Sequence, residues 1–369
     1  MNKWKKVKIK DVCTKGTSSL SLKDLDGKDG NFPVYGAAGL AKKVNFYQQE
    51  NKYLAIIKDG SGVGRLYRFD GKTSVLGTMQ YIFPSDSIDY SFCYYALQSI
   101  DFKKYVNGAA IPHIYFKDYS QEEIPLPTME EQKKIAARLD AVSDLLAKQK
   151  QLLSEQDTLI QSTFYDIFGD PIKNEKGWNS KKLSELGSLK NGINFQKNDN
   201  ESDLYCLGVA DFKDNKYISD ISALQKVPSK SVNLTEDLLK NGDIVFVRSN
   251  GNKALVGRCV AVYPNEEAVT FSGFCIRFRK STTLIKTDYL LYFLKTPQVR
   301  NALAGRGANI QNLNQQILSR VNILCPPLEL QQKFAAVAEQ IEAEKSKIKS
   351  AIAETQTLFN ALMAKYFED

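Results

Sequence analysis

The chain has 369 residues, of which 43% are hydrophobic and 25% are charged, and it carries a formal net charge of +8. This composition is typical of a folded globular protein and excludes a disordered or fibrous chain; the length predicts two or three domains. The most apolar runs, such as Tyr289–Leu294, are far shorter than the ~20 residues that a membrane-spanning helix needs. Because the first ten residues are charged and lack an apolar core, we expect no secretion signal there, and we expect a cytoplasmic protein with no membrane partner.

The cysteine and histidine content argues against a structural metal. The six cysteines are scattered, no Cys-x-x-Cys pair occurs, and His113 is the only histidine. Structural zinc takes four such ligands, usually paired in sequence. We therefore expect no metal site, and thiols that are buried singly in a reducing compartment.

The first predicted element is a strand-rich α+β globule over residues 1–127. Short runs of β-branched and aromatic residues, such as Tyr53–Ile57, alternate with turns rich in Gly, Asn and Asp. The glycine-rich stretch Asp59–Gly64 superficially resembles a nucleotide-binding loop, but Arg65–Phe69 after it reads as another strand and not as a helix. We interpret the glycines as a hairpin turn.

A long helix is predicted next, over residues 128–170. Pro127 marks its start and Gly169-Asp-Pro171 its end, and apolar residues recur between them at steps of four and three, as in a coiled coil. About 40 residues at roughly 1.5 Å each would extend about 60 Å. The predicted seam is Ile135, Leu139, Val142, Leu146, Leu153 and Ile160, interrupted by the polar Gln149 and Gln156.

The two elements then recur as a second globule over 171–326 and a second helix over 327–369. The phrase that begins at Pro127 (PTMEEQKKIAA) matches the phrase that begins at Pro326 (PPLELQQKFAA), and this offset of 199 still holds forty residues later. An ungapped match of that length predicts two copies of one element. The second seam is Phe334, Ile341, Ile348, Ile352, Phe359 and Leu362, with the charged Lys345 among them.

The globules also match each other, though more faintly. Leu54–Ser61 parallels Ile244–Gly251, and Ala109–Ile114 parallels Ala308–Leu313, with about 25 extra residues in the loops of the second copy. His113 stands where the second copy has Asn312, so a role shared by both is hydrogen bonding and not base catalysis. The predicted fold is therefore two similar α+β domains and two long helices that bury each other.

The charge favours DNA binding by the globules. Residues 1–127 carry a net charge of +5 and 171–325 a net charge of +8, whereas the two helical segments carry −3 and −2. A polyanion is held by the basic parts, and Asn, Gln, Arg and Lys side chains can bond base edges. Ordinary solvated lysines remain the alternative reading. The candidate DNA-binding residues are Lys58, Ser61, Arg65, Asn191, Asn194, Gln196, Lys197, Arg248, Asn250, Lys253, Arg258, Arg306 and Asn309.

Motifs for catalysis are absent from the sequence. A metal-dependent nuclease would use clustered carboxylates and a lysine, and fragments such as Asp26-Gly-Lys28 and Asp211-Phe-Lys213 supply only part of such a site. The chain contains no P-loop and no Gly-x-Ser-x-Gly elbow. We keep a self-contained nuclease and a purely structural coiled-coil scaffold as alternatives.

The order of motifs resembles that of the DNA-specificity (S) subunits of type I restriction–modification enzymes over essentially the whole chain. The resemblance rests on Gly108–Ile114, Ile124–Pro127, Glu130–Ala136 and the helix that ends at Phe168–Pro171, and the second copy repeats this order. It implies two target-recognition domains, 1–127 and 171–326, each reading half of a split DNA sequence. The two helices would form an antiparallel coiled coil that fixes the spacing, with pseudo-twofold symmetry.

The resemblance further implies that this chain is not an enzyme and binds no cofactor itself. It would hold two modification (methyltransferase) subunits, which use S-adenosylmethionine to methylate adenine N6, and associate with ATP- and Mg²⁺-dependent restriction/translocase subunits. The Glu-x-Gln starts of the helices, at Glu130 and Glu329, would belong both to the structure and to the modification-subunit contact. It does not identify the base-reading residues.

Overall fold

A computed structural model describes residues 4–108, 110–195, 204–213, 215–229, 232–233, 235–304 and 312–368. The chain forms two compact units: unit 1 is Met1–Leu152 with Ile348–Asp369, and unit 2 is Leu153–Lys347. This division differs from the four consecutive segments expected from the sequence, because it falls inside the long helices. Each unit therefore holds one globule and half of each helix, since helix packing joins segments distant in sequence.

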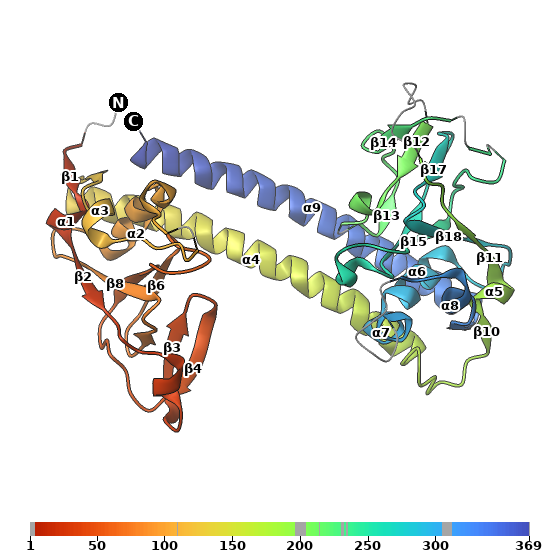
Figure 1. The fold of residues 1–369 in the computed structure, drawn as a ribbon, viewed down its shortest axis with the longest axis horizontal. Helices are drawn as coiled ribbons and strands as arrows, with labels where there is room; N and C mark the ends of the chain where they lie inside the picture. Colours follow the sequence, from red (N-terminus) through yellow and green to blue (C-terminus); the bar gives the residue numbers. More distant parts are fainter. Residues whose placement is uncertain are drawn as a thin grey trace. The chain divides into compact units, whose positions relative to one another are not determined.

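Unit 1 begins with a globule of short strands and helices (Figure 1). Its elements are β1 (Lys6–Lys8), α1 (Ile9–Val12), β2 (Cys13–Thr17), the 3-10 helix η1 (Leu22–Leu25), β3 (Asp29–Gly36), β4 (Gly39–Val44), β5 (Tyr53–Ile57), β6 (Leu66–Phe69), β7 (Ser74–Val75), β8 (Met79–Pro84), α2 (Tyr90–Gln98), η2 (Phe102–Tyr105), α3 (Phe116–Tyr119) and β9 (Glu123–Pro125). The main sheet has the order β2-β8-β5-β6, and smaller sheets have the orders β4-β3-β7 and β1-β9. All five residues of β5 are buried, as a central strand requires.

Unit 2 repeats this topology. Its globule contains β10 (Ser180–Lys182), α5 (Leu183–Leu186), β11 (Gly187–Asn191), β12 (Leu204–Leu207), η3 (Val209–Asp211), β13 (Tyr217–Ile218), β14 (Gln225–Val227), β15 (Asp243–Val247), η4 (Lys253–Leu255), β16 (Cys259–Val262), β17 (Val269–Phe271), β18 (Cys275–Lys280), α6 (Thr287–Lys295), α7 (Pro297–Ala304), α8 (Gln315–Ser319) and β19 (Asn322–Leu324). The sheets are β11-β18-β15-β16-β13, β14-β12-β17 and β10-β19. The match of Leu54–Ser61 to Ile244–Gly251 is confirmed, because β5 and β15 hold the same place in equivalent sheets. Part of the extra sequence of the second copy forms the edge strand β13.

Two helices of 40 residues each, α4 (Met129–Phe168) and α9 (Leu328–Phe367), follow the globules. Each begins one or two residues after the proline that was expected to mark its start, and Gly169 follows the end of α4. In unit 2, Asp157 of α4 binds Lys345 of α9, and Phe168 farther along α4 packs on Phe334 farther back along α9. The two helices therefore run antiparallel in this unit.

The structure buries the predicted seam to different degrees. Ile135, Leu139, Leu146, Ile160, Phe334 and Ile341 are buried, and Val142, Leu153, Ile348, Ile352, Phe359 and Leu362 are half-buried. In unit 1 the start of α4 meets the end of α9, where Arg138 donates a hydrogen bond to the hydroxyl of Tyr366 over 3.0 Å. The 3.5-residue periodicity thus identifies the inward-facing side of each helix.

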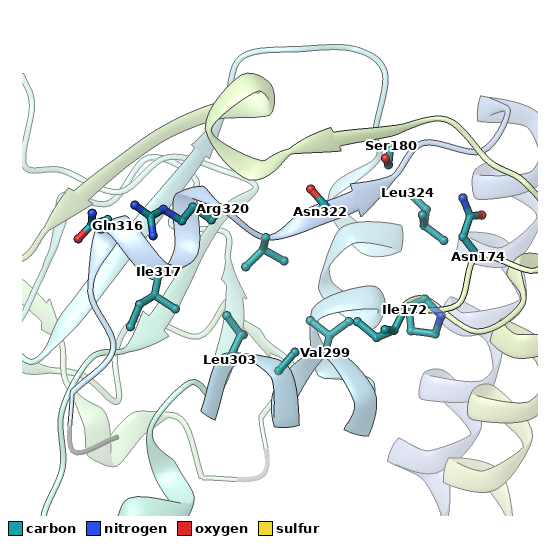
Figure 2. A pocket seen from close by; sticks show the side chains of 13 residues that line it. Ile172, Asn174, Ser180, Val299, Leu303, Gln316, Ile317, Arg320, Asn322 and Leu324 are labelled. Atoms are coloured by element: carbon teal, nitrogen blue, oxygen red, sulfur yellow. The ribbon is translucent and has the colours of Figure 1, made fainter. Parts of the chain in front are cut away.

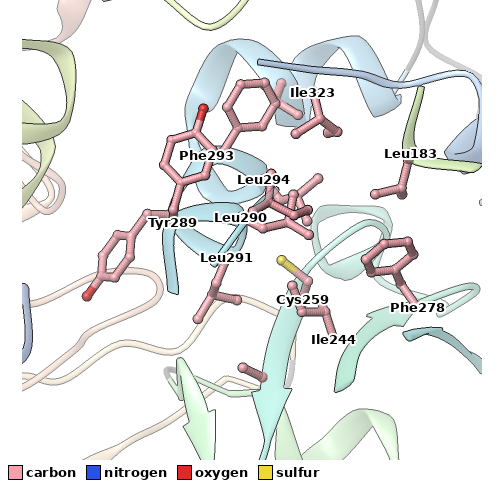
Figure 3. Packing of buried hydrophobic residues seen from close by; sticks show 14 of the residues in the cluster. Leu183, Ile244, Cys259, Phe278, Tyr289, Leu290, Leu291, Phe293, Leu294 and Ile323 are labelled. Carbon is pink, nitrogen blue, oxygen red and sulfur yellow. The ribbon is translucent and has the colours of Figure 1, made fainter. Parts of the chain in front are cut away.

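The long helices contribute to the core of each globule. In unit 2, Phe164 and Phe168 of α4 and Phe334 of α9 contact the aromatic side chains of α6. The apolar run Tyr289–Leu294 proves to be α6, and Figure 3 shows its Leu290 and Leu294 packed toward the sheet residue Cys259. This shared core fixes each globule on its pair of helix halves.

The expectation of singly buried thiols is wrong for one pair. Cys13 at the start of β2 and Cys93 on α2 are both buried, with their Sγ atoms 3.4 Å apart, although all six thiols are free. The hydrogen bond with Cys13 and burial raise the pKa of the Cys93 thiol well above its usual value, which keeps it protonated. The contact arises because strand pairing and helix packing join residues 80 positions apart.

Candidate nucleic-acid interface

The described parts of the predicted DNA-binding loops lie at one edge of the main sheet in each unit. In unit 2, β11 ends at Asn191, which pairs with Ile276, and β15 ends at Val247, which pairs with Cys275 near the start of β18. In unit 1, Ile57 at the end of β5 pairs with Met79 at the start of β8. We call this edge, with the loops that leave it, the loop edge of each unit.

The loop edge of unit 1 is a tight hairpin between β5 and β6. Lys58 is partly buried and pairs with Asp59 over 3.1 Å, whereas Ser61 and Arg65 are exposed. Gly62 has φ +106°, and a Cβ there would lie 2.5 Å from the guanidinium of Arg65, so only glycine lets Arg65 fold over the turn. The hairpin interpretation of Asp59–Gly64 is confirmed.

A second segment lies beside this hairpin and adds side chains that the sequence analysis missed. The amide of Gly60 donates to the carbonyl of Pro112 over 2.8 Å, and the amide of Ile114 donates to the carbonyl of Lys58 over 2.9 Å. Next to these contacts, the side chains of Ile111 and Tyr115 are exposed by 67% and 49%.

Tyr115 carries a cation and an aromatic neighbour. The ammonium of Lys117 lies 5.4 Å from the centre of its ring, and the ring of His113 meets it edge-on at 4.8 Å. Base recognition often combines such cations and aromatic faces. The sequence could have indicated Tyr115, because it directly follows the motif Gly108–Ile114 on which the family resemblance rests.

The loop edge of unit 2 uses the same backbone pairing with different side chains. The amide of Leu313 donates to the carbonyl of Arg248 over 2.8 Å, as Ile114 does to Lys58 in unit 1. His113 and Asn312 occupy corresponding backbone bridges, to Asp59 and Ser249, so their equivalence is confirmed. The Arg248 guanidinium is only partly free, because its Nη1 donates to the carbonyl of Gly273 at 3.4 Å.

Amide and aromatic side chains surround Arg248. Asn191 and Asn194 are exposed, Asn250 is half-buried, and the Phe274 side chain is 57% exposed. The side-chain oxygen of Asn194 lies over Gly273, where it would be 2.0 Å from a Cβ, so a side chain at position 273 would displace the Asn194 amide. A hollow of about 690 Å³ beside them is lined by Asn194, Phe195, Gln225 and Phe274 among others. Its surface can accept and donate hydrogen bonds.

Arg258 is placed differently from what the sequence analysis expected. Its Nη1 donates to the backbone carbonyl of Lys213 over 2.9 Å, so the side chain holds a neighbouring loop instead of extending freely from the surface. Arg65 stands at the matching position of the repeat, since Val63-Gly-Arg65 parallels Val256-Gly-Arg258. Sequence alone could not distinguish the two arginines, because the partner carbonyl of Arg258 lies 45 residues away. Gln196, Lys197, Arg306, Asn309 and the side chain of Lys253 lie outside the described residues.

Each globule is joined to a long helix by a tyrosine, a carboxylate and a cation. In unit 1, Tyr95 of α2 donates to Asp140 of α4 over 2.7 Å, and Arg68 of β6 contacts the same carboxylate at 2.5 Å. In unit 2, Tyr292 of α6 donates to Glu342 of α9 over 3.1 Å, and Lys216 contacts Glu342 at 2.5 Å. Both cations also lie over the tyrosine rings. These joints position the loop edges relative to the helix halves of their own unit.

The Glu-x-Gln starts of the helices require a correction. The side chains of Gln132 and Gln331 are fully buried and bonded inside their own units, so neither is available for a partner. Glu130 and Glu329 are exposed and pair with Lys134 and Lys333 one turn on. Only the glutamates can contribute to an external contact.

A half-open pocket of about 490 Å³ lies in unit 2 between α7, α8 and the β10-β19 pair (Figure 2). Val299 and Leu303 of α7 line one side and Ile317 of α8 lines another, with Arg320 as the charged member. The described lining includes the hydroxyl of Ser180 but holds no carboxylate, histidine or cysteine that could act on it as a base. Across the described part of the chain, no three His, Cys, Asp or Glu side chains are grouped to hold a metal, and no helix is long and apolar enough to cross a membrane.

The duplicated fold, with two unlike loop edges on equivalent sheets, defines a class of proteins built from two related modules. The family model of the type I restriction modification DNA specificity domain matches residues 1–155 and 175–355, and the chain therefore belongs to this family.

Similar proteins carry the same description. The chain is 26% identical to the type I restriction enzyme StySPI specificity subunit of Salmonella potsdam, over 70% of this chain and 60% of the relative's length. It is 24% identical to a putative type I restriction enzyme specificity subunit of Haemophilus influenzae, over 85% of this chain and 80% of the relative. The crystal structure of the type I restriction–modification S subunit from M. genitalium shares the fold, with a TM-score of 0.65 at 16% identity over 100% of this chain and 97% of that one.

Proposed function

We propose that this chain is the non-catalytic specificity subunit of a type I restriction–modification complex, in which each globule reads one half of a two-part DNA target. The observation that carries the proposal is the repeat: β5 and β15 present loops from the same edge of equivalent sheets, but the loops carry different side chains. Two related modules with unlike contact residues suit a target with two unlike halves.

The two loop edges are chemically suited to different bases. Unit 1 offers Arg65, Tyr115 and Lys117, whose cations fit guanine edges and phosphates and whose ring can contact a thymine methyl group. Unit 2 offers Asn191 and Asn194, whose amides can bond an adenine edge in two ways. The net charges of +5 and +8 on the globules draw both edges to a duplex.

The long helices set the spacing in this proposal. Together α4 and α9 would form an antiparallel coiled coil with pseudo-twofold symmetry, and 40 residues extend about 60 Å. One turn of DNA extends about 34 Å, so a rod of this length allows the two halves of the target to lie in successive major grooves.

The helices would also carry the catalytic partners. Leu145, Leu152 and Leu159 are exposed on α4 at intervals of seven residues, which is the spacing that a partner helix would use. We propose that two modification subunits, with S-adenosylmethionine, dock on the helices and methylate adenine N6, and that ATP- and Mg²⁺-dependent restriction subunits join them. The complex would act on DNA in the cytoplasm.

The first test is genome-wide adenine methylation in cells that express this chain with its neighbouring modification subunit. A split, two-part methylated motif that disappears when the chain is deleted supports the proposal and supplies the sequence. A motif that persists or is undivided contradicts it. Cleavage of DNA with Mg²⁺ by the purified chain would favour the nuclease alternative, and DNA affinity that does not fall with salt would favour the scaffold.

A further inference from the structure

Lys345 is a buried charge at the interface of the two long helices in unit 2. Lys345 is only 5% exposed. Its ammonium lies 2.5 Å from the carboxylate of Asp157 on α4 and 3.3 Å from the carboxylate of Glu342, one turn back on α9. Asp157 also lies 3.5 Å from Lys216 of the globule. A lysine without a partner in such a place is strongly destabilising, so the position depends on its carboxylates.

Because α4 and α9 are copies of one sequence, each facing pair of positions along the two antiparallel helices has an equivalent pair in the other unit, which we call the same level. The charge pair occurs at only one of these two equivalent levels. At the offset of 199, the counterpart of Lys345 is Leu146 and the counterpart of Asp157 is Gln356. The equivalent level of unit 1 therefore has a leucine and an amide, without charge. Among the seam positions that the two copies share, the level of Asp157 and Lys345 is where an ion pair in one copy replaces neutral side chains in the other.

The same repeat makes more than one pairing of the long helices possible. Because α4 and α9 share one seam pattern, either helix could pair antiparallel with the same helix of a second chain. In an α4–α4 pair of that kind, Asp157 would face Leu146 of the second chain. In an α9–α9 pair, Lys345 would face Gln356 of the second chain, and Asp157 would be absent.

Glu342 does not distinguish these arrangements. It lies on α9 itself, three residues before Lys345, and so accompanies Lys345 in every pairing. Asp157 is different, because it lies on the other helix and meets Lys345 only when α4 pairs with α9. The choice between like and unlike pairs therefore depends on the Asp157–Lys345 contact.

We propose that the Asp157–Lys345 ion pair specifies the pairing of unlike helices and prevents two copies of this chain from associating through like helices. A single polar residue in a helix seam can select partner and register because a wrong partner removes part of its compensation. Here a like pair would leave the buried Lys345 with Glu342 alone. The ion pair thereby favours the pairing of α4 with α9 of the same chain. It does not depend on DNA binding.

The test uses the full-length chain with a cysteine in place of Leu153, near the middle of α4. In an antiparallel α4–α4 pair, residue 153 comes close to its own copy, so a short bismaleimide links two chains covalently. With Asp157 and Lys345 intact, we expect monomer on a denaturing gel. Adding D157Q and K345L, the residues of the other copy, should raise the covalent dimer several-fold, in proportion to protein concentration.

Matched controls separate pairing from general loss of charge. E329Q with K333L removes an ion pair from the exposed face of α9, with its atoms 2.8 Å apart, and should leave the L153C chain monomeric. The same reagent on the chain without L153C accounts for the native cysteines. Circular dichroism establishes that each variant keeps its helices.

A second variant tests the same rule by adding a charge. L146K leaves Asp157 and Lys345 in place, but in an α4–α4 pair the new ammonium of each chain would face Asp157 of the other. These two ion pairs would replace the two Asp157–Lys345 pairs, and Lys345 would keep Glu342 beside it. In the native pairing the same ammonium would face the neutral Gln356. We expect L146K with L153C to form the covalent dimer as well. Monomer in both the L146K and the D157Q/K345L chains would overturn the proposal.

Discussion

Gln132 and Gln331, one in each copy of the repeat, make the same three hydrogen bonds. The side-chain oxygen of Gln132 accepts from the amide of Asp89 over 2.7 Å. Its side-chain nitrogen donates to the carbonyls of Pro127, at 3.0 Å, and of Ser87, at 3.3 Å. The glutamine thereby joins the start of α4 to the N-cap of α2 and uses both polar atoms of its amide.

Gln331 repeats the arrangement in unit 2. It accepts from the amide of Lys286 over 2.8 Å and donates to the carbonyls of Pro326 and Leu284 at 2.8 and 3.0 Å. We expect Q331A to lower the free energy of unfolding by about 2 kcal/mol, because one buried and two partly buried backbone groups lose their partner. Urea denaturation measures the change.

The neighbouring glutamine provides the control for that experiment. Gln332 is exposed on the same helix, so Q332A should change stability by less than about 0.5 kcal/mol. Q132A should behave like Q331A, since the bonds are equivalent. Equal stability of the Q331A and Q332A chains would show that the buried hydrogen bonds contribute little.

The burial of the helix seam predicts that a charge at Leu146 will destabilise unit 1. Leu146 is buried, whereas the adjacent Leu145 is 46% exposed. We expect L146E to cost about 3 kcal/mol or more through an unpaired buried carboxylate, and L146E with I352E to cost more. Thermal and urea unfolding report the effect, with L145E as the control of equal chemistry. Similar melting of the L145E and L146E chains would count against the seam.

Arg65 and Arg258 occupy equivalent positions of the repeat but differ in their contacts. Arg65 is exposed, whereas Arg258 donates to the carbonyl of Lys213. We expect R65A to weaken DNA binding and to reduce the slope of log affinity against log salt by about 1, with unchanged stability. R258A should lower stability by about 1 kcal/mol through the lost hydrogen bond. Fluorescence anisotropy at several salt concentrations measures the DNA affinity, and thermal melts measure the stability. Lower stability for R65A together with weaker DNA binding for R258A would refute this assignment.

The charge cluster of unit 2 predicts a specific sensitivity to acid. Burial by itself would raise the pKa of Asp157, but hydrogen bonds and charges from Lys345 and Lys216 outweigh it and hold that pKa below the ordinary 3.8. Burial acts in the same direction on Glu342, and Lys216 and Lys345 likewise outweigh it and hold the pKa of that carboxyl below 4.5. A carboxylate with a lowered pKa in the folded state stabilises the fold above its unfolded pKa, and this stabilisation is lost as pH falls through the folded pKa.

The unfolding free energy should therefore decline below about pH 5, as the unfolded state takes up protons first. We expect D157N to flatten this decline and to lower stability at neutral pH. Asp144, exposed on the same helix, supplies the control variant D144N. The measurement is urea unfolding between about pH 3 and 7, and identical slopes for the D157N, D144N and unmodified chains would contradict the role of the cluster.

Sequence alone predicted what depends on periodicity and repetition, and missed what depends on contacts between distant segments. The spacing of Ile135, Leu139 and Leu146 identified the inward side of α4, because the apolar pattern decides which face is buried. The orientation of Gln132 depends on the neighbouring turn at Asp89, 43 residues away, and no local pattern reveals it.

In the candidate interface, too, contacts between segments distant in sequence were not predicted. The hairpin containing Arg65 was predictable from its glycines, but the Ile111–Tyr115 segment joins it only through backbone bonds to Gly60 and Lys58. The contact of Asp157 with Lys345 was not predicted either, since Asp157 lies one position outside the repeating seam. Lys345 was recognised as an interruption, but its partner required the structure.

The division of the proposed reading between two globules predicts a half-by-half exchange of specificity. Replacing residues 1–127 by the first globule of another family member should alter one half of the methylated motif and leave the other half and the spacing unchanged, because β15 and its loop edge stay as they are. The joint between Arg68 and Asp140 crosses the exchange boundary, so the donor should have a cation at the position of Arg68. Methylation sequencing of cells with the hybrid chain reads both halves at once, and a change in both would refute the division of labour.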